Sequence, residues 1–190
     1  MRFYILLVEE LNTWVGKGFG WCTFALTIAV GYEIFARYFF NMPTLWAFDL
    51  SIQMYGAAFM MAGAYALAVQ SHVRADMLYR KTSIKFQASS DLILYFLFFF
   101  PACIALTYTG YNYAAKAWIL KETSWNSPAQ IQVYAFKTLI PLAGVLLVLQ
   151  GVAEVFRCII ALKEGQWPAR NVEEEELEKV LIKKEKKLEI

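Results

Sequence analysis

The stretch FARYFFNMPTLWAFD, residues 35–49, decides the fold, because it ends one long apolar segment and begins another. The connection between the two segments carries almost no charge. The second segment runs into QSHVRADML, residues 70–78, and a loop rich in Arg and Lys follows. Apolar segments of this length, joined by an uncharged loop and followed by a basic one, are typical of helices that cross a membrane with a defined orientation.

The composition of the chain also indicates a membrane protein. Of its 190 residues, 59% are hydrophobic and 17% are aromatic, with a mean hydropathy of +0.42, whereas a soluble domain averages about half apolar residues. Lys and Glu alternate in the tail that follows Glu164, so this charged region offers no basic face to a nucleic acid. We therefore expect no nucleic-acid partner.

Four segments are long and apolar enough to span a bilayer. About 20 apolar residues in a helix cross a hydrocarbon core of about 30 Å, and the segments that qualify are residues 18–40, 45–69, 92–113 and 135–162. Helices are expected because lipid offers no hydrogen-bond partner to an open backbone. The sequence predicts an all-α integral membrane protein with four transmembrane helices, in a membrane domain over residues 18–165.

The distribution of Lys and Arg predicts that both termini are cytoplasmic. The loop between the second and third helices, the N-terminal segment and the tail over residues 166–190 are all basic or rich in Lys, and such segments stay on the cytoplasmic side. Three lysines near the opposite ends of the helices oppose this assignment. Trp46, Trp118 and Trp125 mark the outer membrane boundary, where amphipathic rings are favoured.

Residues 1–17 predict an amphipathic helix that lies in the membrane interface. Apolar residues recur at helical spacing, whereas Glu9, Glu10 and Asn12 lie off that stripe. The alternative is an extension of the first membrane helix. The residues of the stripe are Phe3, Leu6, Leu7, Leu11 and Trp14.

Few residues in the chain suggest catalysis. His72 is the only histidine, and the sequence has neither a phosphate-binding glycine loop nor the spacing of metal ligands. Cys22, Cys103 and Cys158 lie in three separate apolar segments, which favours buried small side chains over a disulfide or redox pair. We expect no enzymatic activity, no metal and no cofactor in this chain.

Polar residues at the ends of the first two crossings are candidate sites. Glu33 and Arg37 are four residues apart, so they share a helix face; they either satisfy each other or meet a partner helix or an ion path. Trp46 and Asp49 begin the second crossing. Asp49 either favours helix initiation through the helix dipole or anchors a neighbouring protein.

The turn after the second crossing holds His72, Arg74 and Asp76. His72 is either a pH sensor or part of a capped turn in which Asp76 begins the next helix. Arg74 is suited to contact anionic lipid.

The positions of proline, glycine and serine predict where the third helix ends and where the fourth helix begins and bends. No Pro or Gly follows residue 113 before Glu122, so the third helix is expected to run beyond the membrane as far as that residue. Ser127-Pro128 predicts the start of the next helix, with Ser as the cap. Pro141 is expected to kink the fourth helix.

Glycines recur on single faces of two helices. Gly56 and Gly63 share a face of the second crossing, and Gly144 and Gly151 share a face of the fourth. Small residues allow close helix packing in lipid.

The junction residues resemble the DctQ-like small membrane subunit of tripartite ATP-independent periplasmic (TRAP) transporters. The resemblance covers about residues 15–165, and Asp49 stands where the family usually has Glu, while Gln70-Ser71 replace a common Gly. The matching residues, in order, are Arg37-Tyr38-Phe39-Phe40-Asn41, Pro43, Trp46 with Asp49, Gly63-Ala64 with Ala66-Leu67, His72-Val73-Arg74-Ala75-Asp76, and Ile140-Pro141-Leu142.

This resemblance implies a division of labour among three proteins. In the family, a large elevator-type membrane subunit binds substrate and sodium, a soluble periplasmic protein captures the substrate, and the small subunit is a scaffold. The implied partners are the large TRAP membrane subunit, the periplasmic substrate-binding protein and membrane lipids, in a bacterial or archaeal inner membrane. The residues expected to shape these contacts are Glu33, Arg37, Asn41, Trp46, Asp49, His72, Arg74 and Asp76.

Three other functions stay open from the sequence. A small multidrug proton antiporter would use Glu33 as its proton site. A membrane anchor of a redox enzyme would borrow a haem ligand from another chain, because His72 stands alone. A quinone-linked thiol oxidase is disfavoured by the scattered cysteines.

Overall fold

The computed structural model describes residues 1–69 and 82–168, and these residues are helical apart from their connections. Four stretches of helix among them are long and apolar enough to cross a membrane. The predicted all-α fold with four such helices is confirmed. The elements are α1 (Arg2–Phe40), α2 (Ala47–Ala68), α4 (Ile84–Leu94), the π-helical segment η1 (Tyr95–Phe99), α5 (Phe100–Leu120), α6 (Tyr134–Lys137) and α7 (Leu139–Glu164).

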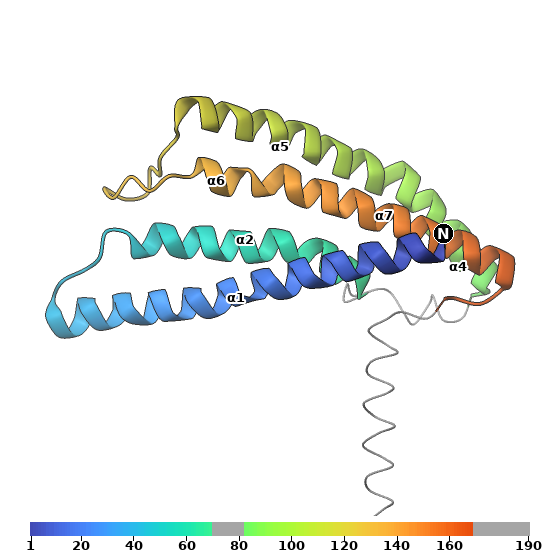
Figure 1. Ribbon diagram of the computed structural model, residues 1–190, viewed down its shortest axis with the longest axis horizontal. Coiled ribbons are helices and arrows are strands. Elements are labelled where there is room, and N and C mark those ends of the chain that lie inside the picture. Colours follow the sequence, from blue (N-terminus) through green and yellow to red (C-terminus); the bar gives the residue numbers. More distant parts are fainter. Residues whose placement is uncertain (70–81, 169–190) are drawn as a thin grey trace, which may run out of the picture.

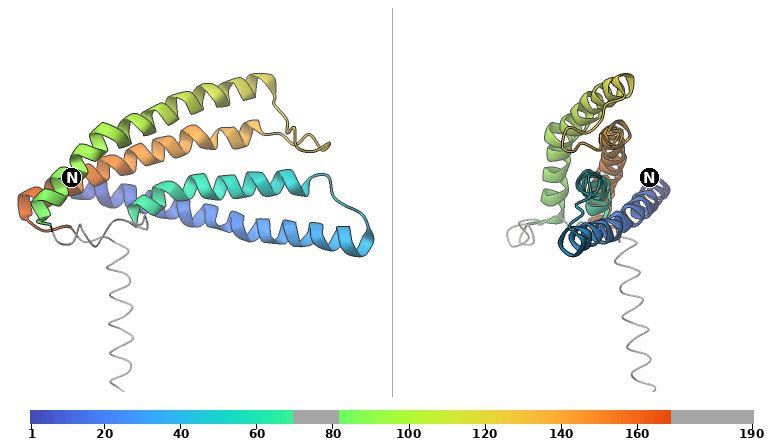
Figure 2. Two further views of the ribbon diagram at one scale, coloured as in Figure 1. Left: turned by 180° about the vertical axis from the view of Figure 1, so that it is seen from behind. Right: turned by 90° about the vertical axis from the view of Figure 1, so that its left-hand side faces the viewer.

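Two helical hairpins make up the bundle. Helix α1 lies along α2, and α5 lies along α7 (Figure 1). Helix α7 also contacts α1, α2 and α4, so it is the central element. The connections over residues 41–46 and 121–133 lie at one end, which we call the loop end, and Met1 and the last turn of α7 lie at the other, which we call the terminal end (Figure 2).

Helix α1 has no break at residue 17, the predicted end of the N-terminal segment. Its 39 residues extend for about 58 Å at 1.5 Å per residue, about twice the thickness of a hydrocarbon core. The N-terminal segment is therefore helical and continuous with the first crossing. Its position in the plane of the interface stays a prediction.

Prolines account for two interruptions in the second hairpin. Pro101 has no N–H, and just before it the Phe100 N–H bonds the Tyr95 carbonyl, five residues back, which makes the π-helical turn η1. Pro141 cannot donate to the Lys137 carbonyl, and α6 ends at that residue. Near the expected kink, the helix is interrupted only at Thr138, between α6 and α7.

The third helix runs on to Leu120, close to the predicted end at Glu122. The predicted helix start at Ser127-Pro128 is wrong, because both residues lie in the connection and α6 begins at Tyr134. The Ser127 hydroxyl is used elsewhere, as described below.

The predicted small-residue faces are packing faces within the chain. A Cβ atom built on Gly56 would lie 2.5 Å from the Phe136 ring, and one on Gly151 would lie 2.5 Å from the Phe99 ring. At Gly144 the new atom would lie 3.2 Å from the Cα of Thr107. Gly63 is less crowded, with Leu147 at 4.0 Å. The helices approach closely where glycine allows it.

Candidate functional site

The predicted pair of Glu33 and Arg37 is present at the loop end. The Arg37 Nε atom donates to Glu33 Oε1 over 3.0 Å, and one guanidinium nitrogen also reaches that oxygen. The second carboxylate oxygen accepts from the backbone N–H of Thr44 over 2.9 Å and from the Thr44 hydroxyl. Glu33 therefore joins the end of α1 to the connection that leads into α2.

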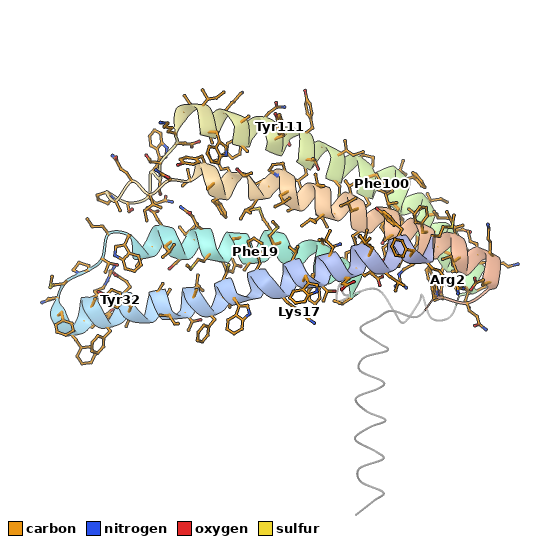
Figure 3. The ribbon with its side chains drawn as sticks, viewed as in Figure 1. Arg2, Lys17, Phe19, Tyr32, Phe100 and Tyr111 are labelled. Atoms are coloured by element: carbon orange, nitrogen blue, oxygen red, sulfur yellow. The ribbon has the colours of Figure 1, made fainter. Side chains whose placement is uncertain are left out.

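Asn41 and Trp46 fix the two ends of that connection. Asn41 has a φ of 53°, in the left-handed region that Asn tolerates, and the next N–H, that of Met42, bonds the Ala36 carbonyl over 3.1 Å. Trp46 precedes α2 and stacks on Tyr32 with ring centroids 6.0 Å apart. Figure 3 shows Tyr32 toward the loop end of α1, and Arg2 at the terminal end.

Asp49 binds the connection over residues 121–133. It is in the first turn of α2, where the dipole favours an acid, and only 2% of its surface is exposed. One carboxylate oxygen accepts from the Ser124 hydroxyl over 2.6 Å, and the other accepts from the Ser127 hydroxyl. Asp49 thus ties the two hairpins together at the loop end.

Lys137 and Glu122 form a second polar contact beside Asp49. The Lys137 ammonium donates to the Glu122 carboxylate and lies 4.0 Å from the centroid of the Tyr113 ring. Lys137 is nearly buried, although it belongs to a membrane-crossing helix. Pairing with a carboxylate and an aromatic face reduces the cost of that burial.

A buried polar network joins α1 to α7 near the terminal end. Arg157 donates through Nε to Glu9 Oε1 over 2.9 Å, and the two side chains are 2% and 6% exposed. Asn12 donates to Gln150 over 2.8 Å, and Gln150 donates to Glu154 over 3.2 Å. One buried atom, Asn12 Oδ1, accepts no hydrogen bond from the described residues.

This network places Glu9 and Asn12 against the rest of the bundle, whereas Glu10 is exposed. Glu9 and Asn12 are buried with Ile5 and Val8, whereas the apolar stripe faces outward, with Phe3 78% and Trp14 73% exposed. In lipid this arrangement is favourable, because polar groups find partners inside the bundle and apolar groups meet acyl chains.

The end of the described chain is attached to the same region. Arg157 donates to the Pro168 carbonyl over 2.9 Å, and the Trp167 indole donates to Gln87 over 3.1 Å. An exposed pair, Arg2 with Glu164, closes the terminal end at 2.7 Å.

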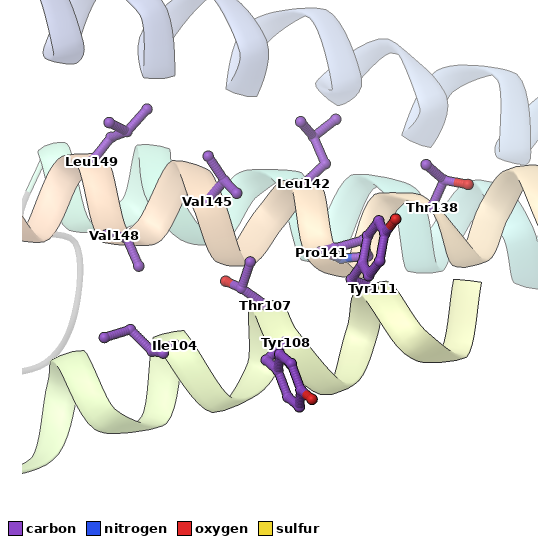
Figure 4. Close-up of a pocket in the computed structure, with 10 residues that line it drawn as sticks. All are labelled: Ile104, Thr107, Tyr108, Tyr111, Thr138, Pro141, Leu142, Val145, Val148 and Leu149. Atoms are coloured by element: carbon purple, nitrogen blue, oxygen red, sulfur yellow. The ribbon is translucent and has the colours of Figure 1, made fainter. Parts of the chain in front are cut away.

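An open apolar cavity of about 670 Å³ lies between α5 and α7. Figure 4 shows Thr107 and Tyr111 rising from α5 toward α7. No charged side chain lines it, so it offers no counter-ion to an anionic solute. The lining residues are Ile104, Thr107, Tyr108, Tyr111, Thr138, Pro141, Leu142, Val145, Val148 and Leu149.

The predicted site residues fall into two groups. Glu33, Arg37, Asn41, Trp46 and Asp49 all lie at the loop end, on or beside the connection between α1 and α2. His72, Arg74 and Asp76 lie outside the described residues, so their predicted roles stay predictions.

Sequence reasoning missed the partners of these residues. Thr44 and Ser124 carry no signal of their own, because a hydroxyl in a loop is common, and the sequence around Ser127 indicates a helix cap instead. The terminal network did leave a signal. Gln150, Glu154 and Arg157 are spaced i, i+4, i+7 in an otherwise apolar helix, and such a stripe predicts a polar partner on one face.

Four apolar helices, with buried polar side chains paired inside the bundle, define a small helical integral membrane protein. The family model described as the DctQ component of tripartite ATP-independent periplasmic transporters matches residues 26–161. The match covers well over half of the chain, so the chain belongs to this family. No curated protein matches the sequence.

Proposed function

We propose that this chain is the non-catalytic small permease subunit of a TRAP transporter. It braces the large elevator-type membrane subunit during sodium-driven, binding-protein-dependent uptake of an organic acid. The family match over residues 26–161 carries the proposal. The coupling ion and the substrate would bind to the large subunit, so no cofactor is assigned to this chain.

The interior of the described helices supports a scaffold. In this interior, Glu9 pairs with Arg157, and Lys137 pairs with Glu122. The cavity between α5 and α7 has no charged lining. A path for an anionic solute would need polar groups that are available to that solute.

The proposed orientation places the loop end outside the cytoplasm and the terminal end, with both termini, inside it. It follows the basic loop after the second crossing. The exposed apolar stripe of residues 2–17 would then contact lipid at the cytoplasmic interface. The membrane would be the inner membrane of a bacterium or archaeon.

An antiporter function is not favoured by the geometry of Glu33. A proton-coupled carboxylate must be released and rebound, whereas Glu33 is held by Arg37 and Thr44. We expect the purified chain, reconstituted alone under a pH gradient, to transport no cationic dye. The Glu33→Gln variant is expected to give the same zero flux. Dye accumulation by the original chain that disappears in Glu33→Gln would instead establish an antiporter.

The proposed scaffold role predicts that Arg37→Ala and Trp46→Ala weaken the complex. Each change removes a side chain that fixes the connection between α1 and α2. We expect recovery of the large subunit with a tagged small subunit, and sodium-driven uptake in proteoliposomes, to fall severalfold. Arg2→Ala and Trp21→Ala are matched controls, because both side chains are exposed and distant from that connection. Normal assembly and uptake in both loop-end variants would contradict their assignment.

A further inference from the structure

A second cavity, of about 410 Å³, opens at the loop end beside Asp49. Residues of α2, α5, α6 and the connection over residues 121–133 line it. Unlike the cavity between α5 and α7, it has charged side chains in its lining. Its charged and aromatic lining residues are Asp49, Glu122, Lys137, Tyr113, Trp125 and Phe136.

The charges around this cavity do not cancel. Lys137 is bound to Glu122 and to the face of Tyr113. Asp49 accepts only from the hydroxyls of Ser124 and Ser127 and has no cationic partner among the described residues. A carboxylate has about four acceptor positions, and burial of an unpaired carboxylate is costly. The cavity therefore has the net charge of one carboxylate and acceptor capacity to spare.

Trp125 lines this cavity, on a connection whose backbone is hydrogen-bonded to itself. Its surface is 93% exposed although it is a large aromatic residue. On either side of it the backbone is paired, with Ser124 N–H bonded to the Ile131 carbonyl over 2.8 Å and Val133 N–H bonded to the Glu122 carbonyl over 3.0 Å. Tryptophan is enriched among the residues that anchor protein interfaces.

We propose that this cavity receives one arginine side chain of the soluble substrate-binding protein. The inference rests on the proposed function, because it takes the binding protein as a partner. The guanidinium would donate to the Asp49 carboxylate and stack on the Trp125 ring. Arginine fits better than lysine, because its planar group both pairs with a carboxylate and stacks on an aromatic face.

The location of the cavity favours the soluble protein as the source of that arginine. The cavity lies at the loop end, and part of its wall is the connection over residues 121–133, which joins two membrane crossings. In the proposed orientation this connection faces the compartment in which the binding protein diffuses. A net negative cavity would also attract a basic partner at long range.

The test measures docking of the binding protein on the complete membrane complex in nanodiscs by biolayer interferometry. We expect Asp49→Asn and Trp125→Ala each to raise the Kd at least tenfold, measured on complexes that retain the large subunit. Trp14→Ala, at another exposed tryptophan in the first half of α1, should leave the Kd unchanged. Alanine substitutions of the binding protein's arginines should identify one whose loss weakens docking to the original complex. The same substitution should cause no further loss of affinity when the complex carries Asp49→Asn.

Other results overturn the inference. If the complex with Trp125→Ala assembles fully and docks the binding protein normally, the proposed arginine site is wrong. The proposed function would not be affected by that result. Loss of the large subunit from both variants would show that this subunit occupies the cavity instead. Additivity of every arginine substitution with Asp49→Asn would exclude an arginine as the occupant.

Discussion

Arg157→Met is expected to destabilise the isolated chain by about 3–5 kcal/mol, because it removes the guanidinium that binds the buried Glu9 carboxylate. Arg157 is 2% exposed, and it also donates to the Pro168 carbonyl. The first half of α1 should then separate from α7, since the ion pair lies in their contact. Thermal unfolding of the detergent-solubilised chain measures the loss, and hydrogen exchange of residues 2–17 reports the separation.

A matched control exists on the same two helices. Arg2 pairs with Glu164, with side chains 70% and 51% exposed, and an exposed pair contributes below about 1 kcal/mol. Arg2→Met should therefore change the unfolding temperature little. The double variant Glu9→Gln, Arg157→Met should recover much of the stability, because neither charge is then buried alone. Equal losses in Arg2→Met and Arg157→Met would show that burial is not the cause.

The sequence predicted what depends on local spacing. The four apolar segments, the contact of Glu33 with Arg37 and the extension of the third helix follow from neighbours a few residues apart. Glu9 and Arg157 are 148 positions apart in the sequence, and neither segment contains a pattern that identifies the other as its partner. This pair could be recognised only from the packing of α1 on α7.

Two predictions depended on which side of a helix faces its partner. The spacing places Glu9 and Asn12 off the apolar stripe but does not say what that side of the helix faces, and in the structure it is buried against α7. In water the apolar stripe would pack inward, whereas in lipid the polar side does so. Ser127 was read as a helix cap, but Asp49 competes for its hydroxyl. The sequence shows the residues of each contact, but it does not show that they lie close together in the fold.

Gly144→Ala is expected to destabilise the chain by about 1–3 kcal/mol, the usual cost of overpacking. A Cβ atom at this position would lie 3.2 Å from both Cα and N of Thr107, and closer still to its hydroxyl oxygen. Two of these three contacts are with backbone, so a side-chain rotation cannot relieve them, and α5 must move away from α7. Gly144→Leu should lower the yield of folded chain further, as measured by size-exclusion chromatography.

Gly20→Ala separates this contact from helix propensity. Alanine in a helix is more stable than glycine by about 0.5–1 kcal/mol, and a Cβ atom at Gly20 would meet nothing within 4 Å. The same substitution should therefore stabilise α1 at Gly20 and destabilise the bundle at Gly144. Both unfolding temperatures are compared on the isolated chain, where no partner helix can cover Gly20. A rise at both positions would mean that α5 and α7 have room to separate, and that close packing at Gly144 does not hold the second hairpin together.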